Sequence, residues 1–478
     1  MTRISVQLFV LFISTIVCLS AVAQTDSLRL SREEYQALVA RIERIEAEQT
    51  KTKQQDSITK SREVRLTIGG YGEATTKYCF YSNNYLRYGK TPSKYKNDTY
   101  GEVDLPHFVI YLGYNFGKGW SLGSEIEFEH GGTESAIEIE EEEGGEYESE
   151  IERGGEVALE QFWLQKKFND YAIIRAGMQV LPVGALNAHH ESTEYFGVYR
   201  PEGEYTILPS TWHEVALTFM GKTPFGLHYQ AMLIPGLDSD RFNRKNWIKP
   251  GAGSPYEFKL ANVWAGAARI DYTGVPGLHL SLSGYYGASF RNTLSKTNAE
   301  LDANKYYKDI KGMVSVGSFD FRYKAHNLIL RGNFTYGHLS DAARITQYNI
   351  AMSKTSVSSQ QWIASDALAT GIEAGYDFFA LSPKLREKKQ QFYVFARYEY
   401  YDSMHRYDGH KVYTYAWCGR QRAAMGVNYF PIPQIGVKAE YAYGILNPGV
   451  RADNSIGKIY NDEPMVAVGV VFAGMFQH

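Results

Sequence analysis

The 478-residue sequence has few cysteines, little net charge and, beyond its N-terminus, no long apolar segment. A transmembrane helix needs about 20 consecutive apolar residues, and no such run follows residue 23. If the mature chain lies in a membrane, it must cross as a closed β-barrel, because only helices and closed barrels satisfy every backbone polar group in lipid. The near balance of 50 Lys and Arg against 53 Asp and Glu also argues against a nucleic-acid partner.

Motifs of known enzyme classes are missing as well. The chain has no GxSxG, P-loop, HExxH or CxxC segment, and its Ser and His residues form no local constellation. His189, His190 and Glu191 are adjacent, which is not the ligand spacing of known metal sites, and we interpret them as part of a solvated loop. We therefore expect no catalytic activity, no metal and no cofactor.

The first 23 residues have the pattern of a cleaved signal peptide. One cation, Arg3, precedes an apolar stretch, and residues 21–23 (Ala-Val-Ala) form a small-x-small cleavage site before Gln24. Cys18 lacks the preceding small residue that a lipoprotein signal needs. Cleavage leaves 49 basic residues against 53 acids, a net charge of −4.

Aromatic residues and glycine are abundant, although the chain is hydrophilic on average. It contains 37 Tyr, 24 Phe, 7 Trp and 44 Gly, and its mean hydropathy is −0.35. Transmembrane barrels have this composition because polar lumen residues alternate with apolar lipid-facing ones, and aromatics gather at both interfaces. A secreted soluble β protein has a similar composition, so the pattern along the chain must decide.

From residue 64 onward, apolar residues recur with a period of two. In the last segment the large Val466 and Val468 share one face, and the small Ala467 and Gly469 share the other. Large residues would face lipid and small ones the lumen. We predict sixteen strands, near residues 64–78, 103–116, 119–130, 156–168, 171–180, 212–223, 225–235, 257–273, 277–289, 311–324, 327–338, 367–379, 390–402, 421–430, 434–444 and 464–476.

The connections between these strands alternate in length. Short turns, such as 169–170 and 325–326, alternate with much longer connections, which is typical of outer-membrane barrels with periplasmic turns and extracellular loops. The sequence therefore predicts an all-β fold, a transmembrane antiparallel β-barrel of about 16 strands over 64–478. We expect it in the bacterial outer membrane, in contact with lipid and lipopolysaccharide.

Residues 24–63 are expected to lie in the periplasm as a helical segment and linker. Apolar residues at positions 35, 38, 42 and 45 have the 3-4-3 spacing of a heptad. About two heptads are fewer than a coiled coil usually needs, and a short amphipathic helix packed on another surface fits equally well.

Strand phase sorts the charged residues of the predicted lumen. Basic side chains that line a pore favour the passage of anions, so we expect the inner lumen to prefer anions weakly. Alternatively, the Arg–acid pairs only brace the barrel wall and select no ion. Glu125, Glu127 and Glu129 fall toward the extracellular mouth. The predicted pore-lining cations are Lys167, Arg175, Arg269, Arg322, Arg331, Arg397, Arg422 and Lys438.

Two long loops have unusual compositions. Residues 125–156 hold fourteen Glu and a single Lys or Arg, Arg153. This composition indicates a solvated surface loop or, alternatively, a collector of divalent cations. Residues 181–211 are too apolar and too rich in Gly and Pro for a simple exposed tip. This loop could fold inward and narrow the lumen, with Arg200 and Tyr205 as constriction candidates.

Cys79 and Cys418 are the only cysteines left after cleavage. Both fall near predicted extracellular ends, where an oxidising environment permits pairing. Their strands are not neighbours in the predicted barrel, so a disulfide would require two outer loops to meet.

Several segments resemble the phosphate-selective porin O and P family in its Bacteroidetes-type form. They are the heptad segment, the closing strand, LEQFWLQKKFNDYAIIRAGMQVLPVGALN (159–187) and WHEVALTFMGK (212–222). The resemblance implies a 16-stranded, homotrimeric porin with an inward loop and basic lumen residues that guide anions. Two features depart from it, since the lumen cations form no dense ladder and one outer loop is rich in Glu.

These observations leave three functional hypotheses. The leading one is a porin for passive diffusion of small hydrophilic solutes, with a weak preference for anions such as phosphate. The second is a substrate-specific outer-membrane uptake channel. The third is a barrel enzyme or a surface adhesin.

Overall fold

The computed structural model describes the C-terminal part of the chain with several gaps. The predicted signal peptide (1–23) and the predicted periplasmic segment (24–63) lie outside the described residues. Among the described residues, no helix is long and apolar enough to cross a membrane. The described residues are 65–80, 99–131, 157–254, 258–294, 298–352, 361–408, 417–447 and 460–476, with the backbone of 136–141 and 147–152.

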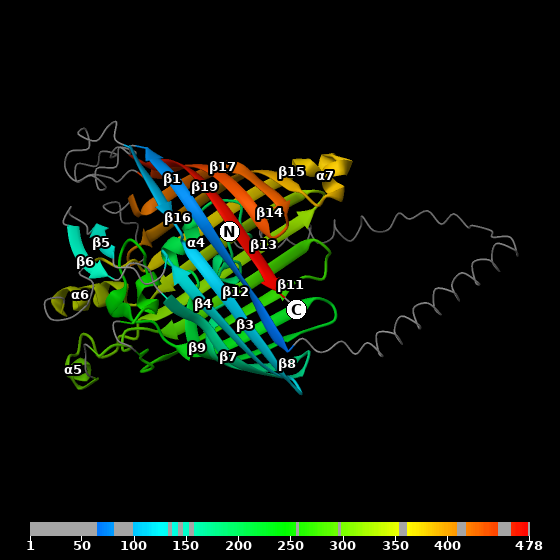
Figure 1. Ribbon diagram of the computed structural model, residues 1–478. Coiled ribbons are helices and arrows are strands. Elements are labelled where there is room, and N and C mark those ends of the chain that lie inside the picture. Colours follow the sequence, from blue (N-terminus) through cyan, green and yellow to red (C-terminus); the bar gives the residue numbers. More distant parts are fainter. Residues whose placement is uncertain are drawn as a thin grey trace, which may run out of the picture. The chain divides into compact units, whose positions relative to one another are not determined.

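One antiparallel sheet closes on itself into a barrel (Figure 1). Closure is made by the first and last strands, which pair along most of their length, from Ile68 opposite Phe476 to Cys79 opposite Met465. β2 (Thr99–Asp104) and β3 (His107–Gly117) both pair with β1 and occupy one position in the wall, which is therefore sixteen strands wide. The other strands of the wall are β1 (Leu66–Phe80), β4 (Trp120–Glu129), β7 (Val157–Asn169), β8 (Ala172–Val180), β9 (His213–Lys222), β10 (Leu227–Pro235), β11 (Trp264–Tyr272), β12 (Leu278–Ala288), β13 (Met313–Ala325), β14 (Leu328–Leu339), β15 (Asp366–Asp377), β16 (Gln391–Arg406), β17 (Gly419–Ile432), β18 (Ile435–Leu446) and β19 (Tyr460–Phe476).

Each predicted strand corresponds to one position of this wall. The predicted assignment of alternate residues to the inner and outer faces is confirmed. In β13, Ser318 and Asp320 are buried while Phe319 between them is exposed. In the closing strand, Ala467 is buried and Val466 is exposed, as the alternation of size predicts. The wall therefore has an apolar outer face and a polar inner face.

The two ends of the barrel differ in their connections. At the short-turn end, β7 and β8 are joined through Asp170 and Tyr171, and β13 and β14 through His326 and Asn327, both with positive φ. The connection from β15 to β16 is longer and holds η4 (Phe378–Leu381) and α7 (Pro383–Glu387). At the opposite, long-loop end, the connections include α5 (Asn298–Ala303) and α6 (Ala342–Met352) (Figure 1). A separate hairpin of β5 (Ala136–Glu141) and β6 (Tyr147–Glu152) belongs to the acidic loop.

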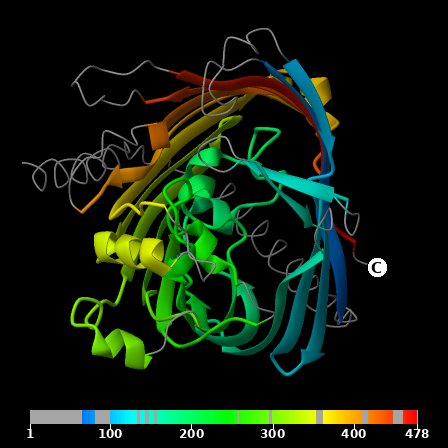
Figure 2. The same cartoon turned by 90° about the vertical axis from the view of Figure 1, so that its left-hand side faces the viewer.

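The main apolar cluster lies inside the ring of strands, not between two sheets. Figure 2, seen from the long-loop end, shows the green segments of the β8–β9 and β10–β11 connections within the ring. Trp247 is fully buried, and its indole nitrogen donates to the carbonyl of Ala364 at 3.1 Å. Its ring takes the space beside Gly337, where a Cβ would lie 2.0 Å from it. The long loops thus pack on the inner wall.

The disulfide considered from the sequence is not formed. Cys79 and Cys418 are both buried free thiols. Cys79 is in β1 and Cys418 directly precedes β17, so β18 and β19 lie between them. Neighbouring strands are about 4.8 Å apart, so three such steps separate the two cysteines. This distance exceeds the roughly 7 Å between Cα atoms that a disulfide can span.

Candidate functional site

The β8–β9 connection, residues 181–212, enters the barrel and is called the inward loop below. It contains two short helices, α3 (Ala185–Ala188) and α4 (Glu202–Ile207). Gly184 precedes α3 with φ 88°, a conformation that glycine adopts without strain, and Pro201 precedes α4. Apolar loop side chains such as Leu181 and Ile207 are fully buried. The composition of the loop therefore reflects an inward position, which the sequence had left open.

Three carboxylates of the wall bind the backbone of the inward loop. Glu373, Glu399 and Glu440 project inward from β15, β16 and β18, and each is at least nine-tenths buried. Backbone N–H groups of the loop donate to them, so the loop is held through its main chain and not through particular side chains. The bonds run from Phe196 to Glu373 (3.3 Å), from Val198 to Glu440 (2.7 Å) and from Gly203 to Glu399 (2.9 Å).

Arg397 of β16 lies at the centre of these carboxylates. Its guanidinium is 3.5 Å from Glu373, 3.2 Å from Glu399 and 2.9 Å from Glu440. Only 3% of Arg397 is exposed. Removal of its charge would leave Glu399 and Glu440 buried without a cationic partner among the described residues, whereas Glu373 would keep Arg331. We call Arg397 and these three carboxylates the carboxylate clamp.

Lys438 of β18 holds the same loop from a neighbouring position. It is fully buried, and its ammonium group has no ion-pair partner among the described residues. Its three hydrogens instead meet three carbonyl oxygens of the inward loop, which satisfies the donor capacity of an ammonium group. The acceptors are Ser192, Tyr195 at 2.7 Å and Gly197 at 3.0 Å.

Four other predicted pore-lining cations are paired with acids. Two of these pairs hold the inward loop, through Glu194 and Glu202, and two brace the wall. Most predicted pore-lining cations therefore have partners within the barrel. The pairs are Arg322–Glu194 (2.8 Å), Arg422–Glu202, Arg331–Glu373 (2.6 Å) and Arg269 with Asp271 (2.7 Å) and Asp320 (2.9 Å).

The ion pair of Glu194 is strong enough to alter its titration. Burial alone would raise the pKa of Glu194, but the hydrogen bond with His189 and the charge of Arg322 lower it to about 2. Burial also lowers the pKa of His189, which lies in the same contact. This part of the inward loop therefore stays attached to β13 over the whole neutral and mildly acidic range.

The remaining two predicted cations lie outside this network. Lys167 pairs with Asp170 at 2.7 Å beside a turn at the short-turn end, and both side chains are about half exposed. Arg175 lies over the ring of Trp163 at 3.9 Å and donates to Gln165 at 2.7 Å. Arg175 is thus held without a carboxylate partner among the described residues.

The two constriction candidates take different positions. Arg200 donates from Nε to the carbonyl of His190 at 3.2 Å, so it stabilises the inward loop itself. Tyr205 of α4 is 43% exposed, and the ammonium of Lys249, from the β10–β11 connection, lies 3.2 Å from its ring centroid. Sequence reasoning missed Glu204, whose carboxylate accepts from Leu186 and Thr335 deep in the barrel; an acid within a mostly apolar loop was the available signal.

A cleft of about 950 Å³ opens between the inward loop and the wall toward the short-turn end. Three cations, Arg322, Lys324 and Arg331, line it together with one acid, Glu194. The charge of its lining is therefore positive. Residues 391, 430 and 433, near the ends of β16 and β17, also line it.

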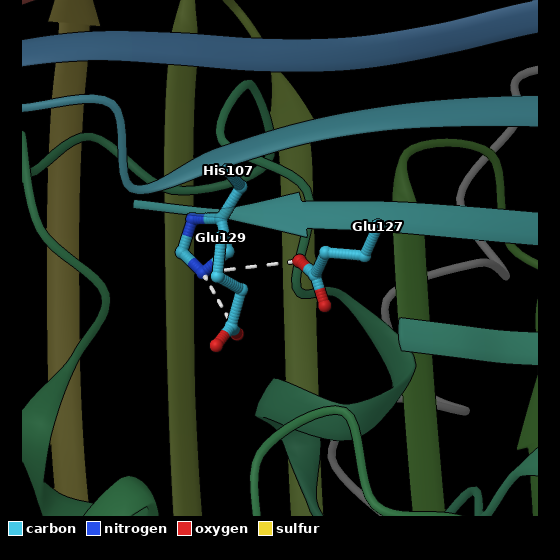
Figure 3. A group of neighbouring side chains, drawn as sticks. All are labelled: His107, Glu127 and Glu129. Carbon is cyan, nitrogen blue, oxygen red and sulfur yellow. Dashed lines mark ion pairs between the residues drawn. The ribbon is translucent and has the colours of Figure 1, made fainter. Parts of the chain in front are cut away.

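The predicted mouth acids lie on the opposite side of the barrel, in β4. Glu125 and Glu127 are each 2% exposed, and Glu129 is more open. Figure 3 shows Glu127 and Glu129 pointing toward His107, whose Nε2 is 3.9 Å and 4.0 Å from them. The other ring nitrogen of His107 is 2.7 Å from Glu73. This wall is acidic, in contrast to the cleft.

Comparison with known proteins finds a distant sequence relative. No family model matches the chain. It is 25% identical over 387 residues to an uncharacterized protein of Aquifex aeolicus, which covers 79% of this chain and 75% of that protein. The resemblance to the phosphate-selective porin O and P family therefore stays a prediction.

Three solved structures are similar to the chain in outline, each over 86% of its length. They are an anion-selective porin from Comamonas acidovorans (10% identity, 99% of that chain, TM-score 0.46), the outer-membrane channel DcaP of Acinetobacter baumannii (11%, 97%, 0.45) and Salmonella typhi OmpF in complex with daunomycin (12%, 97%, 0.46). With TM-scores below 0.5, the fold assignment rests on the strand pairing of this chain itself.

Proposed function

We propose that this chain is an outer-membrane porin through which small hydrophilic solutes diffuse passively, and that the inward loop forms its constriction. One observation carries the proposal: a closed barrel combines an exposed apolar outer face with a charged inner face. Side chains such as Phe319 and Leu282 would form a large exposed apolar patch in water, which marks a surface that meets lipid. The inner face suits water and ions.

We further propose a weak preference for anions, set by the cleft beneath the inward loop. Its lining of Arg322, Lys324 and Arg331 against Glu194 is positive, and cationic linings favour anions. The preference is weak because two of these arginines are already paired with carboxylates. Phosphate is the solute of this class that we propose, since Arg binds its oxygens well.

Proteoliposome swelling in isotonic sugars of increasing size tests passive diffusion. The expected result is rapid influx of small uncharged sugars and a cutoff as size increases, because the inward loop narrows the lumen. Equal exclusion of the smallest sugars and of the largest would contradict the proposal. It would favour a substrate-specific channel or a barrel without transport.

Reversal potentials in a KCl gradient test the ion preference. We expect a reversal potential shifted slightly toward that of chloride. The shift should be smaller in Lys324→Glu, which replaces a cation of the cleft lining by an acid. Lys167→Glu at the exposed turn is the matched control and should change it less. Cation selectivity of the wild type would contradict the proposal. The homotrimer that the resemblance implies stays a prediction, testable by crosslinking.

A further inference from the structure

A β-bulge in β7 adds an extra acid to the inner wall. Gln161 pairs with Glu125 and Leu159 with Ile126, so Glu160 between them has no opposite residue. A bulge of this kind turns two successive side chains toward the same face. Glu160 is fully buried, and it joins Glu125 and Glu127 on a wall that simple alternation would have made less acidic.

Several polar atoms around Glu160 lack hydrogen bonds. Glu127 and Thr211 lie beside the Glu160 carboxylate, but neither of its oxygens accepts a hydrogen bond of normal geometry, and the same holds for Oε1 of Glu125 and Nε2 of His190. The hydroxyl of Tyr71, also fully buried and close to these acids, has no partner either. Native proteins leave few buried polar atoms unsatisfied, and a cluster of them indicates an ion or a water that completes the site.

The orientation of His190 favours an ion. Its Nδ1 lies 3.2 Å from the carbonyl of Asn187, so this nitrogen donates a proton and Nε2 keeps a free lone pair. Nε2 faces Glu125 at 3.8 Å. Metal-binding histidines are commonly held in this way, with the other ring nitrogen bonded to a carbonyl or a carboxylate.

We propose that Glu125, Glu160 and His190 bind a divalent transition-metal ion such as Zn²⁺. One ligand atom from each lies within 4.8 Å of the others. Ligand atoms of a tetrahedral Zn²⁺ are about 3.4 Å apart, so small side-chain movements complete the geometry. Two carboxylates and one imidazole suit Zn²⁺ better than Ca²⁺, which prefers oxygen ligands throughout.

The local charge also favours a cation. Glu125, Glu127, Glu160 and Glu73 are all buried on this side of the barrel, and the charge of Arg200 acts on two of them, Glu127 and Glu73. The neighbouring set of His107, Glu127 and Glu129 (Figure 3) is more open, since the Glu129 side chain is 34% exposed. We therefore assign the ion to the inner set.

Such an ion would fasten the inward loop to the wall opposite the carboxylate clamp. His190 belongs to the loop, whereas Glu125 and Glu160 belong to β4 and β7. The loop is then held on both sides of the lumen, and the occupancy of the metal site regulates how firmly the constriction is closed. This role is independent of the solute that the pore carries.

Calorimetric titration of Zn²⁺ into the full, untagged protein, stripped with EDTA and held in detergent, tests the site. We expect one ion per chain at the highest affinity, and at least tenfold weaker binding in Glu160→Gln and in His190→Ala, since each loses a ligand. His189→Ala is the matched control and should bind as the wild type does, because His189 contacts Glu194 instead.

Folding is checked by heat-modifiable mobility in gels, and Glu160→Gln should retain it because the change removes a buried unpaired charge. Deletion of 134–152 should remove weak surface binding and leave the tight site intact. The proposal is overturned if the wild type binds no stoichiometric Zn²⁺, if Glu160→Gln and His190→Ala bind it unchanged, or if Ca²⁺ binds as tightly as Zn²⁺.

Discussion

Replacement of Arg397 by Met should release the inward loop from the wall. Methionine keeps much of the volume but removes the charge that lies 2.9–3.5 Å from Glu373, Glu399 and Glu440. Glu373 keeps a second cation, Arg331, whereas Glu399 and Glu440 lose the cation that compensates them. Removal of one partner from a buried ion pair costs about 3–5 kcal/mol. That corresponds to a factor of roughly 10² to 4 × 10³ in the equilibrium between docked and released loop. The barrel itself should persist, because its strands pair independently of the clamp.

Single-channel recording in planar bilayers measures this change directly. With the loop released, conductance steps of Arg397→Met should be larger and noisier than those of the wild type, because the loop no longer narrows the lumen steadily. Arg175→Met is the matched control. It also removes one lumen cation, but the Arg175 guanidinium contacts Gln165 and Trp163 and no carboxylate of the described residues. Wild-type steps in Arg397→Met, or the same increase in Arg175→Met, would refute this role of the clamp.

Three further predictions concern the same loop and the acidic loop. Lys438→Met leaves three buried loop carbonyls without a donor, at about 1–3 kcal/mol each, and should give noisier channels; wild-type noise would contradict this. The pKa of Glu194 is lowered from its ordinary 4.5 to about 2. The bond between Glu194 and Arg322 therefore stabilises the docked loop fully above about pH 4.5 and is lost as the pH falls through about 2. Channel noise should be constant from neutral pH to about pH 5 and increase only near pH 2. If residues 134–152 collect divalent cations, calorimetric titration of Ca²⁺ should show weak binding that their deletion abolishes; unchanged Ca²⁺ binding after deletion would place it elsewhere.

The barrel was predictable because its signals are local. Alternation with a period of two identified every position of the wall, and the phase of Phe319 against Asp320 assigned the outer and inner faces correctly. The lengths of the connections identified the short-turn end. In a strand, successive side chains point to opposite faces of the wall, so the alternation of apolar and polar residues can be read from a single sequence.

The partners inside the barrel were not predictable in the same way. Arg397 and Lys438 were identified as inward-facing cations, but their partners, Glu440 and the carbonyl of Ser192, depend on how the inward loop folds back. Glu160 was missed because a bulge breaks the alternation on which the assignment depends. Long-range contacts of this kind leave no periodic signal in the sequence.

The central claim is that this barrel encloses a water-filled passage narrowed by the inward loop. Conductance of the purified wild-type protein in planar bilayers tests it most directly. We predict large, steady, ohmic current steps in symmetrical KCl. Insertion without any conductance would contradict the claim, since a closed barrel with no passage cannot act as a porin or as an uptake channel.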